Sequence, residues 1–81
     1  DQRADRRARN RQIAEERRRT ARLEQVEERI HELESNLAEL SRKLADPEIT
    51  PQVVKKLGQE YVKFQDELDL LMEEWGVLHR Q

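Results

Sequence analysis

Apolar residues recur along the chain in two long stripes, at alternating spacings of three and four residues. One stripe runs from Leu23 to Leu44 and the other from Val54 to Leu78. The stripes consist of Leu23, Val26, Ile30, Leu33, Leu37, Leu40 and Leu44, and of Val54, Leu57, Tyr61, Phe64, Leu68, Leu71, Trp75 and Leu78. This is the a and d pattern of heptad-repeat helices, so the sequence predicts two α-helices that bury these stripes.

The segment between the stripes carries signals that end one helix and begin another. Pro47 disfavours helical dihedral angles at Asp46, so the first helix is expected to end near Ala45. Thr50 can cap the second helix through its hydroxyl, with Pro51 in the first helical position. The connection of about five residues is short enough to make the helices antiparallel. The expected fold class is therefore all-α, a two-helix antiparallel coiled-coil hairpin with a basic N-terminal helical extension.

The two stripes can be aligned in more than one register. Pairs whose residue numbers sum to 101 give every apolar residue of the first stripe an apolar partner, and they place Val26 opposite Trp75. Pairs that sum to 94 would set Arg19 against Trp75, so the first register is favoured. Trp75 is large for a two-helix layer, and its indole N–H is expected at the edge of the interface. The favoured register predicts two ion pairs between the helices, Arg29 with Glu74 and Lys43 with Glu60.

Charge divides the chain into two parts. Residues 1–22, the arm, hold nine arginines and four acidic residues, whereas residues 23–81 hold seven basic and fourteen acidic residues. A basic arm on an acidic body indicates a polyanionic partner. The arm lacks the stripe but is rich in helix formers, so we expect it to extend the first helix beyond the hairpin. The expected organisation is an Arg-rich extension over 1–22 and a hairpin over 23–81, with a first helix to about residue 45, a turn over 46–50 and a second helix over 51–80.

Basic side chains concentrate in the arm and at the turn end of the hairpin, the tip. Both groups could hold phosphates by counterion release, which is independent of nucleotide sequence. The alternative is surface charge that only keeps a coiled coil in solution. The candidate nucleic-acid-binding residues are Arg6, Arg7, Arg11, Arg17 and Arg18 in the arm and Arg42, Lys43, Lys55 and Lys56 at the tip.

Composition argues against an enzyme. Charged residues make up 42% of the chain, aromatic residues 4%, and there is no cysteine. His31 and His79 lie off the stripes, no Gly-rich phosphate loop is present, and two helices cannot enclose a water-excluding site. We therefore expect no catalytic, cofactor-binding or metal-binding residue. No apolar run approaches the roughly 20 residues of a membrane span, so a cytoplasmic module without membrane contact is expected.

Three apolar residues in the second half of the second helix lie off its stripe: Leu70, Met72 and Val77. They are expected either to cover Ile13 and Ala14 of the arm or to contact a second copy of the chain. A homodimer is therefore one of the partner hypotheses.

Two short motifs carry a resemblance to a known family. Leu-Ala-Asp-Pro stands at 44–47 and Glu-Glu-Trp at 73–75. With these motifs, roughly residues 20–80 resemble the C-terminal coiled-coil domain of ABC-F ATPases of the Uup-like group. The C-terminal arms of valyl-tRNA synthetases and the N-terminal hairpin of bacterial release factors share the same plan and remain alternatives.

The resemblance implies a non-catalytic accessory domain of a tandem ATPase. ATP, Mg²⁺ and hydrolysis would belong to ATPase domains elsewhere in the same chain. In Uup-like relatives this domain binds DNA, while other relatives act on the ribosome in translation or antibiotic resistance. The expected partner is therefore DNA or ribosomal RNA. The alternative function is a purely structural spacer or dimerisation coiled coil with no nucleic-acid role.

Overall fold

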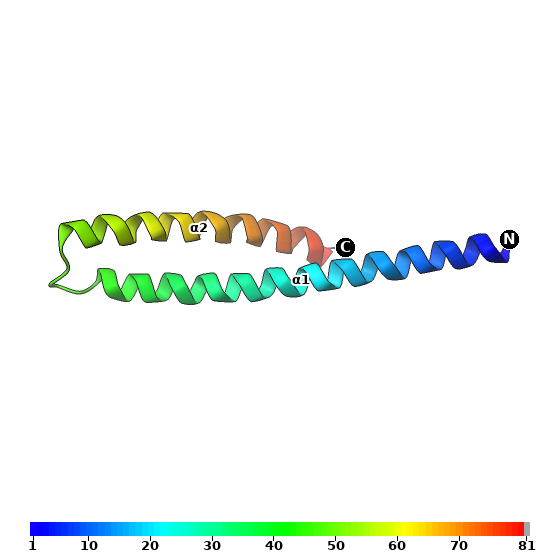
Figure 1. Cartoon of the computed structure of the whole chain (residues 1–81), viewed down its shortest axis with the longest axis horizontal. Helices are drawn as coiled ribbons and strands as arrows, with labels where there is room; N and C mark the ends of the chain where they lie inside the picture. The colour runs from blue at the N-terminus through cyan, green and yellow to red at the C-terminus, as the bar shows by residue number, and fades with distance from the viewer. Residues whose placement is uncertain (81) are drawn as a thin grey trace.

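Two long helices form the molecule. A computed structural model describes residues 1–80, with α1 spanning Gln2–Leu44 and α2 spanning Pro51–Arg80. The helices run side by side in opposite directions, and α1 continues well past the end of α2 (Figure 1). The described chain is an extended rod of 72 × 17 × 14 Å. The predicted all-α antiparallel hairpin with a helical extension is confirmed.

Local hydrogen bonds shape the turn at the tip. The Ala45 N–H, just after α1, still donates to a carbonyl one turn earlier. The Asp46 carboxylate then accepts from the Glu48 N–H at 2.9 Å, which stabilises the bend beside Pro47. The Thr50 hydroxyl accepts from the N–H of Val53 at 3.3 Å, so the predicted cap of the second helix is confirmed.

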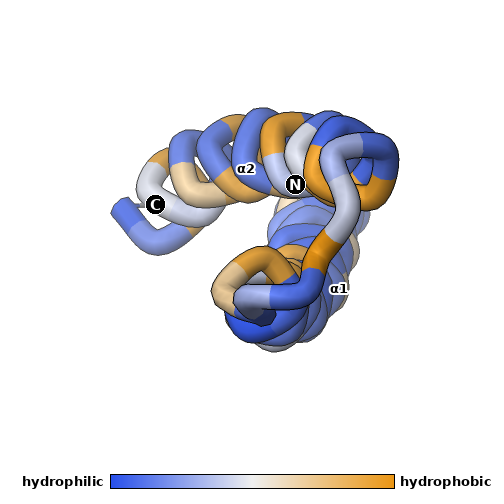
Figure 2. Tube along the Cα trace, turned by 90° about the vertical axis from the view of Figure 1, so that its left-hand side faces the viewer, coloured by the Kyte–Doolittle hydropathy of each residue, from blue (hydrophilic) through white to orange (hydrophobic). Residues whose placement is uncertain are grey.

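The apolar core is a narrow seam between the helices. Within residues 1–80 four residues are buried, all from the stripe of α1: Val26, Leu33, Leu37 and Leu40. No residue of α2 is fully buried, and its stripe from Leu57 to Leu78 is half-buried. Seen along the rod, apolar segments of α1 are turned toward α2 (Figure 2).

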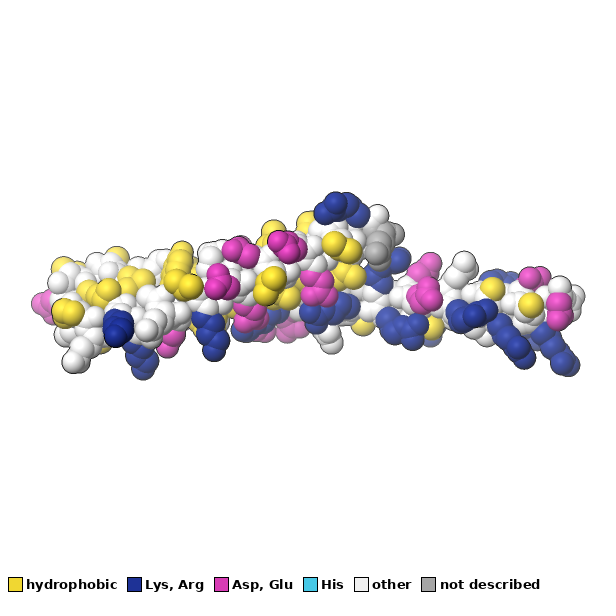
Figure 3. All heavy atoms as spheres, turned by 90° about the horizontal axis from the view of Figure 1, so that it is seen from above, with side chains coloured by type: hydrophobic (Ala, Val, Ile, Leu, Met, Phe, Trp, Pro, Cys, Tyr) yellow, Lys and Arg dark blue, Asp and Glu magenta, His cyan; other side chains and the backbone are white. Residues whose placement is uncertain are grey.

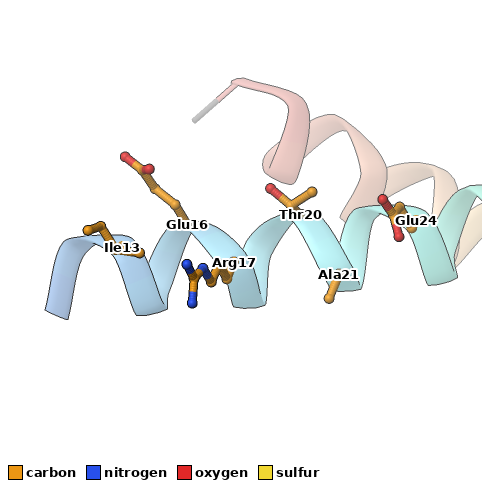
Figure 4. A pocket seen from close by; sticks show the side chains of 6 residues that line it. All are labelled: Ile13, Glu16, Arg17, Thr20, Ala21 and Glu24. Carbon is orange, nitrogen blue, oxygen red and sulfur yellow. The ribbon is translucent and has the colours of Figure 1, made fainter. Parts of the chain in front are cut away.

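The position of Trp75 agrees with the favoured register. Its indole Nε1 donates to Oε1 of Glu27, the neighbour of Val26, at 3.1 Å. The expected placement of the indole N–H at the edge of the interface is thus confirmed. The last turns of α2 lie over the turn of α1 that carries Thr20, not over Ile13 (Figure 4).

The predicted ion pairs between the helices are wrong. Arg29 pairs with Glu67, and Glu74 pairs with Arg22. The observed pairing gives both arginines a carboxylate partner, which the predicted pairing does not. If Arg29 took Glu74, Arg22 would face the end of the second helix, where residues 76–80 include no carboxylate, whereas a shift of one heptad gives each arginine a carboxylate.

The predicted Lys43–Glu60 pair does not form either. The Lys43 Nζ lies 3.6 Å from Oε1 of Glu39, one turn earlier on α1. A lysine four residues after a glutamate can pair along its own helix, and such exposed pairs contribute a few tenths of a kcal/mol. The sequence interpretation did not weigh this intrahelical competitor.

Candidate nucleic-acid interface

The arm is a single exposed helix that belongs to the N-terminal half of α1. Nearly all its side chains are exposed, and α2 ends before reaching most of it (Figure 1). Lys and Arg side chains gather along this part of the rod in the space-filling view (Figure 3). Within residues 1–80, none of the arginines between positions 3 and 19 makes an ion pair. These guanidinium groups are available to an external anion.

Helical spacing sorts the five candidate arginines of the arm into two neighbouring rows. Each residue turns the helix by about 100°, so positions separated by four, seven or eleven residues share a face. The first row, the arginine row, consists of Arg7, Arg11 and Arg18. The second row consists of Arg6 and Arg17 and shares its face with Ile13. The acidic residues Asp5 and Glu16 lie on the other half of the helix, together with Arg9 and Arg19. Glu15 lies beside the arginine row, four residues after Arg11 and three before Arg18.

The face of the arginine row continues along α1 to Arg22, at the end of the arm, and to Arg29 in the hairpin, and both of these arginines are paired. Arg22 binds Glu74 through two hydrogen bonds of 2.6 and 2.7 Å. Arg29 binds Glu67 at 2.6 and 3.0 Å and also reaches Glu32 at 3.1 Å. Two parallel N–H to oxygen bonds form the strongest geometry for such a pair. Both arginines therefore join α1 to α2. The sequence interpretation expected an ion pair between the helices for Arg29, with a different partner, and expected none for Arg22.

These bonds change the acidity of the two glutamates. The hydrogen bond from Arg29 lowers the pKa of Glu67, with a smaller contribution from the charge of Lys63. The hydrogen bond from Arg22 likewise lowers the pKa of Glu74. The pKa of Arg29 is raised, chiefly by its bond to Glu67 and next by its bond to Glu32. The carboxylates thus stay ionised in the folded chain at a pH where they would be partly protonated in the unfolded chain.

A pH dependence of stability follows from the lowered pKa values. The stabilisation is present above the unfolded carboxyl pKa, about 4.3, and is lost as pH falls through the lower folded values. We expect the midpoint temperature of thermal unfolding to fall as the pH is lowered below about 4.3. The variant Glu67→Gln should have a lower midpoint temperature at pH 7 and a smaller decrease of that temperature in acid. Circular dichroism melts between pH 7 and pH 3 measure both. Glu34→Gln, at a glutamate without an ion pair in residues 1–80, is the control, and an equal effect in both variants would contradict the role of Glu67.

At the tip, the structure does not gather the four candidate residues into one cluster. Lys43 and Lys56 line the same hollow of about 490 Å³, whose floor includes Ile49, Val53 and Leu57. Arg42 shares a separate shallow hollow with Lys43, and Lys55 lines neither. Lys55 and Lys56 are adjacent in sequence, but one helical step of about 100° turns them to different faces. Asp46 and Glu48 also line the larger hollow and reduce its positive charge.

The arm and the tip lie at opposite ends of the rod (Figure 1). With a long dimension of 72 Å, the molecule offers two separate basic regions and not one continuous surface. The arm is the stronger of the two, because its row has three arginines beside one acidic residue, Glu15, whereas Asp46 and Glu48 share the hollow of Lys43 and Lys56 at the tip.

A comparison with protein families gives one match. The sequence profile of the ABC transporter C-terminal domain matches residues 14–80. The chain belongs to this family. The domain is found in ABC-F proteins such as Uup, which confirms the resemblance drawn from the two short motifs. No curated protein and no solved structure gives a significant match.

Membership in the ABC transporter C-terminal domain family makes this chain a non-catalytic accessory domain of an ABC ATPase. Among the described residues of this C-terminal domain, no group of three or more His, Asp or Glu side chains could hold a metal ion. Neither helix, over residues 1–80, is both long and apolar enough to cross a membrane. The family match begins at residue 14, so it includes Arg17 and Arg18 but not Arg6, Arg7 or Arg11.

Proposed function

We propose that this ABC transporter C-terminal domain contacts nucleic acid, either DNA or ribosomal RNA, through the basic side of its arm. One observation carries the proposal. Arg22 and Arg29 are occupied by ion pairs with Glu74 and Glu67, whereas the arginine row of the arm has no such partner among residues 1–80. Guanidinium groups in a row on one helix face suit phosphate groups, which they bind with planar, two-pronged hydrogen bonds.

The geometry of the row supports contact with a phosphate backbone. At a rise of 1.5 Å per residue, the Cα atoms of Arg7 and Arg11 lie about 6 Å apart along the helix, and those of Arg11 and Arg18 about 10.5 Å apart. Asp5 and Glu16 lie away from the row, and Glu15 lies beside it, so a backbone that follows the row meets three guanidinium groups and one carboxylate. Contacts of this kind position a protein without reading base sequence.

The tip provides a weaker second region in this proposal. Lys43 and Lys56 share one hollow, and Arg42 lies beside Lys43, while Lys55 faces elsewhere. With Asp46 and Glu48 nearby, we expect the tip to add affinity only when the arm is already bound.

The wider setting of the proposal is a cytoplasmic ABC-F type ATPase. The hydrolysis of ATP with Mg²⁺ would occur in ATPase domains of the same chain, and this domain would bring them to nucleic acid. The rival function is a rigid spacer, which the 72 Å length of the rod favours.

A salt titration separates the two functions. The 81-residue chain is titrated against labelled duplex DNA, branched DNA and a ribosomal RNA fragment, and anisotropy is read at about 50 and 200 mM salt. Three phosphate contacts from the arginine row predict an affinity for duplex DNA that falls about 40-fold over this range. The ratio of affinities for the three probes identifies the preferred nucleic acid. Absence of binding to all three at the lower salt would leave only the spacer.

A further inference from the structure

An aromatic pair lies near the end of α2. The rings of Trp75 and His79, one helical turn apart, are stacked with their centroids 4.7 Å apart and their planes inclined by 12°. The indole is held in place, because its Nε1 donates to Oε1 of Glu27 at 3.1 Å. Trp75 is half-buried, whereas His79 is exposed although the indole lies against one face of its ring. We call this pair the aromatic platform, and its outer ring, the imidazole, is open to solvent.

The aromatic platform lies on a flank of the hairpin, next to the arm. Glu27, Thr20 and Ile13 follow one another at steps of seven residues, so they share a face of α1. Ile13 also shares its face with the second arginine row. The last turns of α2 lie over the turn of α1 that carries Thr20 (Figure 4). The side of α1 that carries the second row therefore leads along the rod to the aromatic platform.

Arg17 is the arginine of the second row nearest to the aromatic platform. The indole of Trp75 binds Glu27, and His79 lies one turn further along the antiparallel α2, level with about residue 23 of α1. Arg17 lies about 9 Å beyond that level along the helix. Within residues 1–80 Arg17 makes no ion pair. A strand with a base on the platform can therefore set a neighbouring phosphate against this guanidinium group.

The flank beside the aromatic platform is not covered by α2. One expectation for Leu70, Met72 and Val77 was that they cover the arm within the same chain. That expectation is wrong, because the three side chains are 68%, 49% and 54% exposed and Ile13 is itself 46% exposed. A ligand that follows the arm thus reaches the platform without displacing any part of residues 1–80.

Acidic side chains near the aromatic platform favour an uncharged ring as its direct ligand. Glu16 and Glu24 line the same hollow of about 420 Å³ as Arg17, and Glu27 holds the indole. A phosphate placed on the platform itself would meet these carboxylates. A nucleobase is uncharged and binds through its ring face, and unpaired bases stack on aromatic side chains, histidine included.

We propose that the aromatic platform of Trp75 and His79 stacks an unpaired nucleobase, while Arg17 holds a phosphate of the same strand. This inference rests on the proposed contact with nucleic acid and adds a preference for unpaired segments. The bases of a duplex are already stacked on one another, so a duplex uses only the phosphate contacts of the arm. The arginine row lies on a different face of α1, so a branched nucleic acid with paired and unpaired segments can use both contacts at once.

Titrations with a single strand and a duplex test the platform. Labelled oligothymidylate of about ten nucleotides and a duplex of the same length are titrated with the 81-residue chain, and anisotropy is read at low salt. His79→Ala should lower the affinity for the single strand about fivefold or more and leave the affinity for the duplex unchanged. His79→Phe keeps an aromatic ring and should retain the single-strand affinity. His31→Ala, at an exposed histidine in the hairpin part of α1, is the matched control and should change neither affinity.

The fluorescence of Trp75 reports the contact directly, because it is the single tryptophan of the chain. The single strand should quench the indole emission, and a strand of the same length without bases should not. Arg17→Gln should reduce the slope of log affinity against log salt concentration by about 0.7 on the single strand and leave the quenching at saturation intact. Circular dichroism confirms that each variant keeps its helix content.

The outcomes separate the platform from the proposed function. An unchanged single-strand affinity in His79→Ala, or equal quenching by the strand without bases, would overturn the platform while the duplex contact of the arm stands. A chain that binds neither the duplex nor the single strand would overturn the proposed function and the platform together.

Discussion

Replacing Leu33 with alanine is expected to lower the free energy of unfolding by about 3 kcal/mol, enough to unfold much of the hairpin at 37 °C. Leu33 is completely buried, at 0% exposure, near the middle of the seam. Truncation of a buried leucine removes its transfer free energy and leaves a cavity that the surroundings refill only in part. Urea unfolding followed by circular dichroism at 222 nm measures the loss.

The size of this effect follows from how few residues form the core. Among the described residues, 1–80, only four side chains are buried, so Leu33 contributes a large share of the apolar burial that supports both helices. Small domains have little stability to spare. Val53→Ala is the control, because Val53 is 43% exposed, and it should change the free energy of unfolding by less than about 0.5 kcal/mol. A loss below about 1 kcal/mol for Leu33→Ala would mean that the seam is not the main source of stability.

The second large effect is expected for nucleic-acid affinity. Replacing Arg7, Arg11 and Arg18 together with glutamine should reduce the slope of log affinity against log salt by about 2.7 units on duplex DNA. The weakening should be similar for duplexes of different sequence, because phosphate contacts carry no base information. Anisotropy titrations over several salt concentrations measure the slope.

The matched control removes the same charge from other faces of the arm. Arg6, Arg9 and Arg17 replaced together with glutamine give an equal change in net charge but leave the arginine row intact. The control variant should retain most of the slope of log affinity against log salt concentration. Equal loss of slope in both triple variants would show that the arm acts through its overall charge and would contradict a specific arginine row.

The hairpin itself was predictable, since periodicity is a strong signal. Fifteen stripe positions without a polar interruption indicate two helices, and Asp46-Pro47 with Thr50-Pro51 marks the turn. The edge position of the Trp75 indole follows from its size alone. These features depend on local rules that hold wherever the pattern occurs.

The pairing of charges was not predictable in the same way. Heptad geometry offers Arg29 two carboxylates, and the choice depends on Arg22, which the charge division assigned to the arm. The sequence interpretation also grouped the basic residues of the tip, for a different reason. Lys55 and Lys56 are adjacent in sequence and look like one cluster, but they lie on different faces of the second helix. The division of the arm into two rows follows from spacing, but it required a helix that is unbroken from Gln2 onward.

The continuity of α1 ties the orientation of the arm to that of the hairpin. No glycine or proline occurs in its 43 residues, so there is no hinge between the arginine row and the seam. The angular phase between them is set by residue count: each inserted or deleted residue near position 20 would swing the row about 100° around the rod. Insertions or deletions between the arm and the hairpin therefore keep the arginine row on the same side only when their length is close to whole helical turns. A twist applied to the arm is transmitted along α1 to the hairpin.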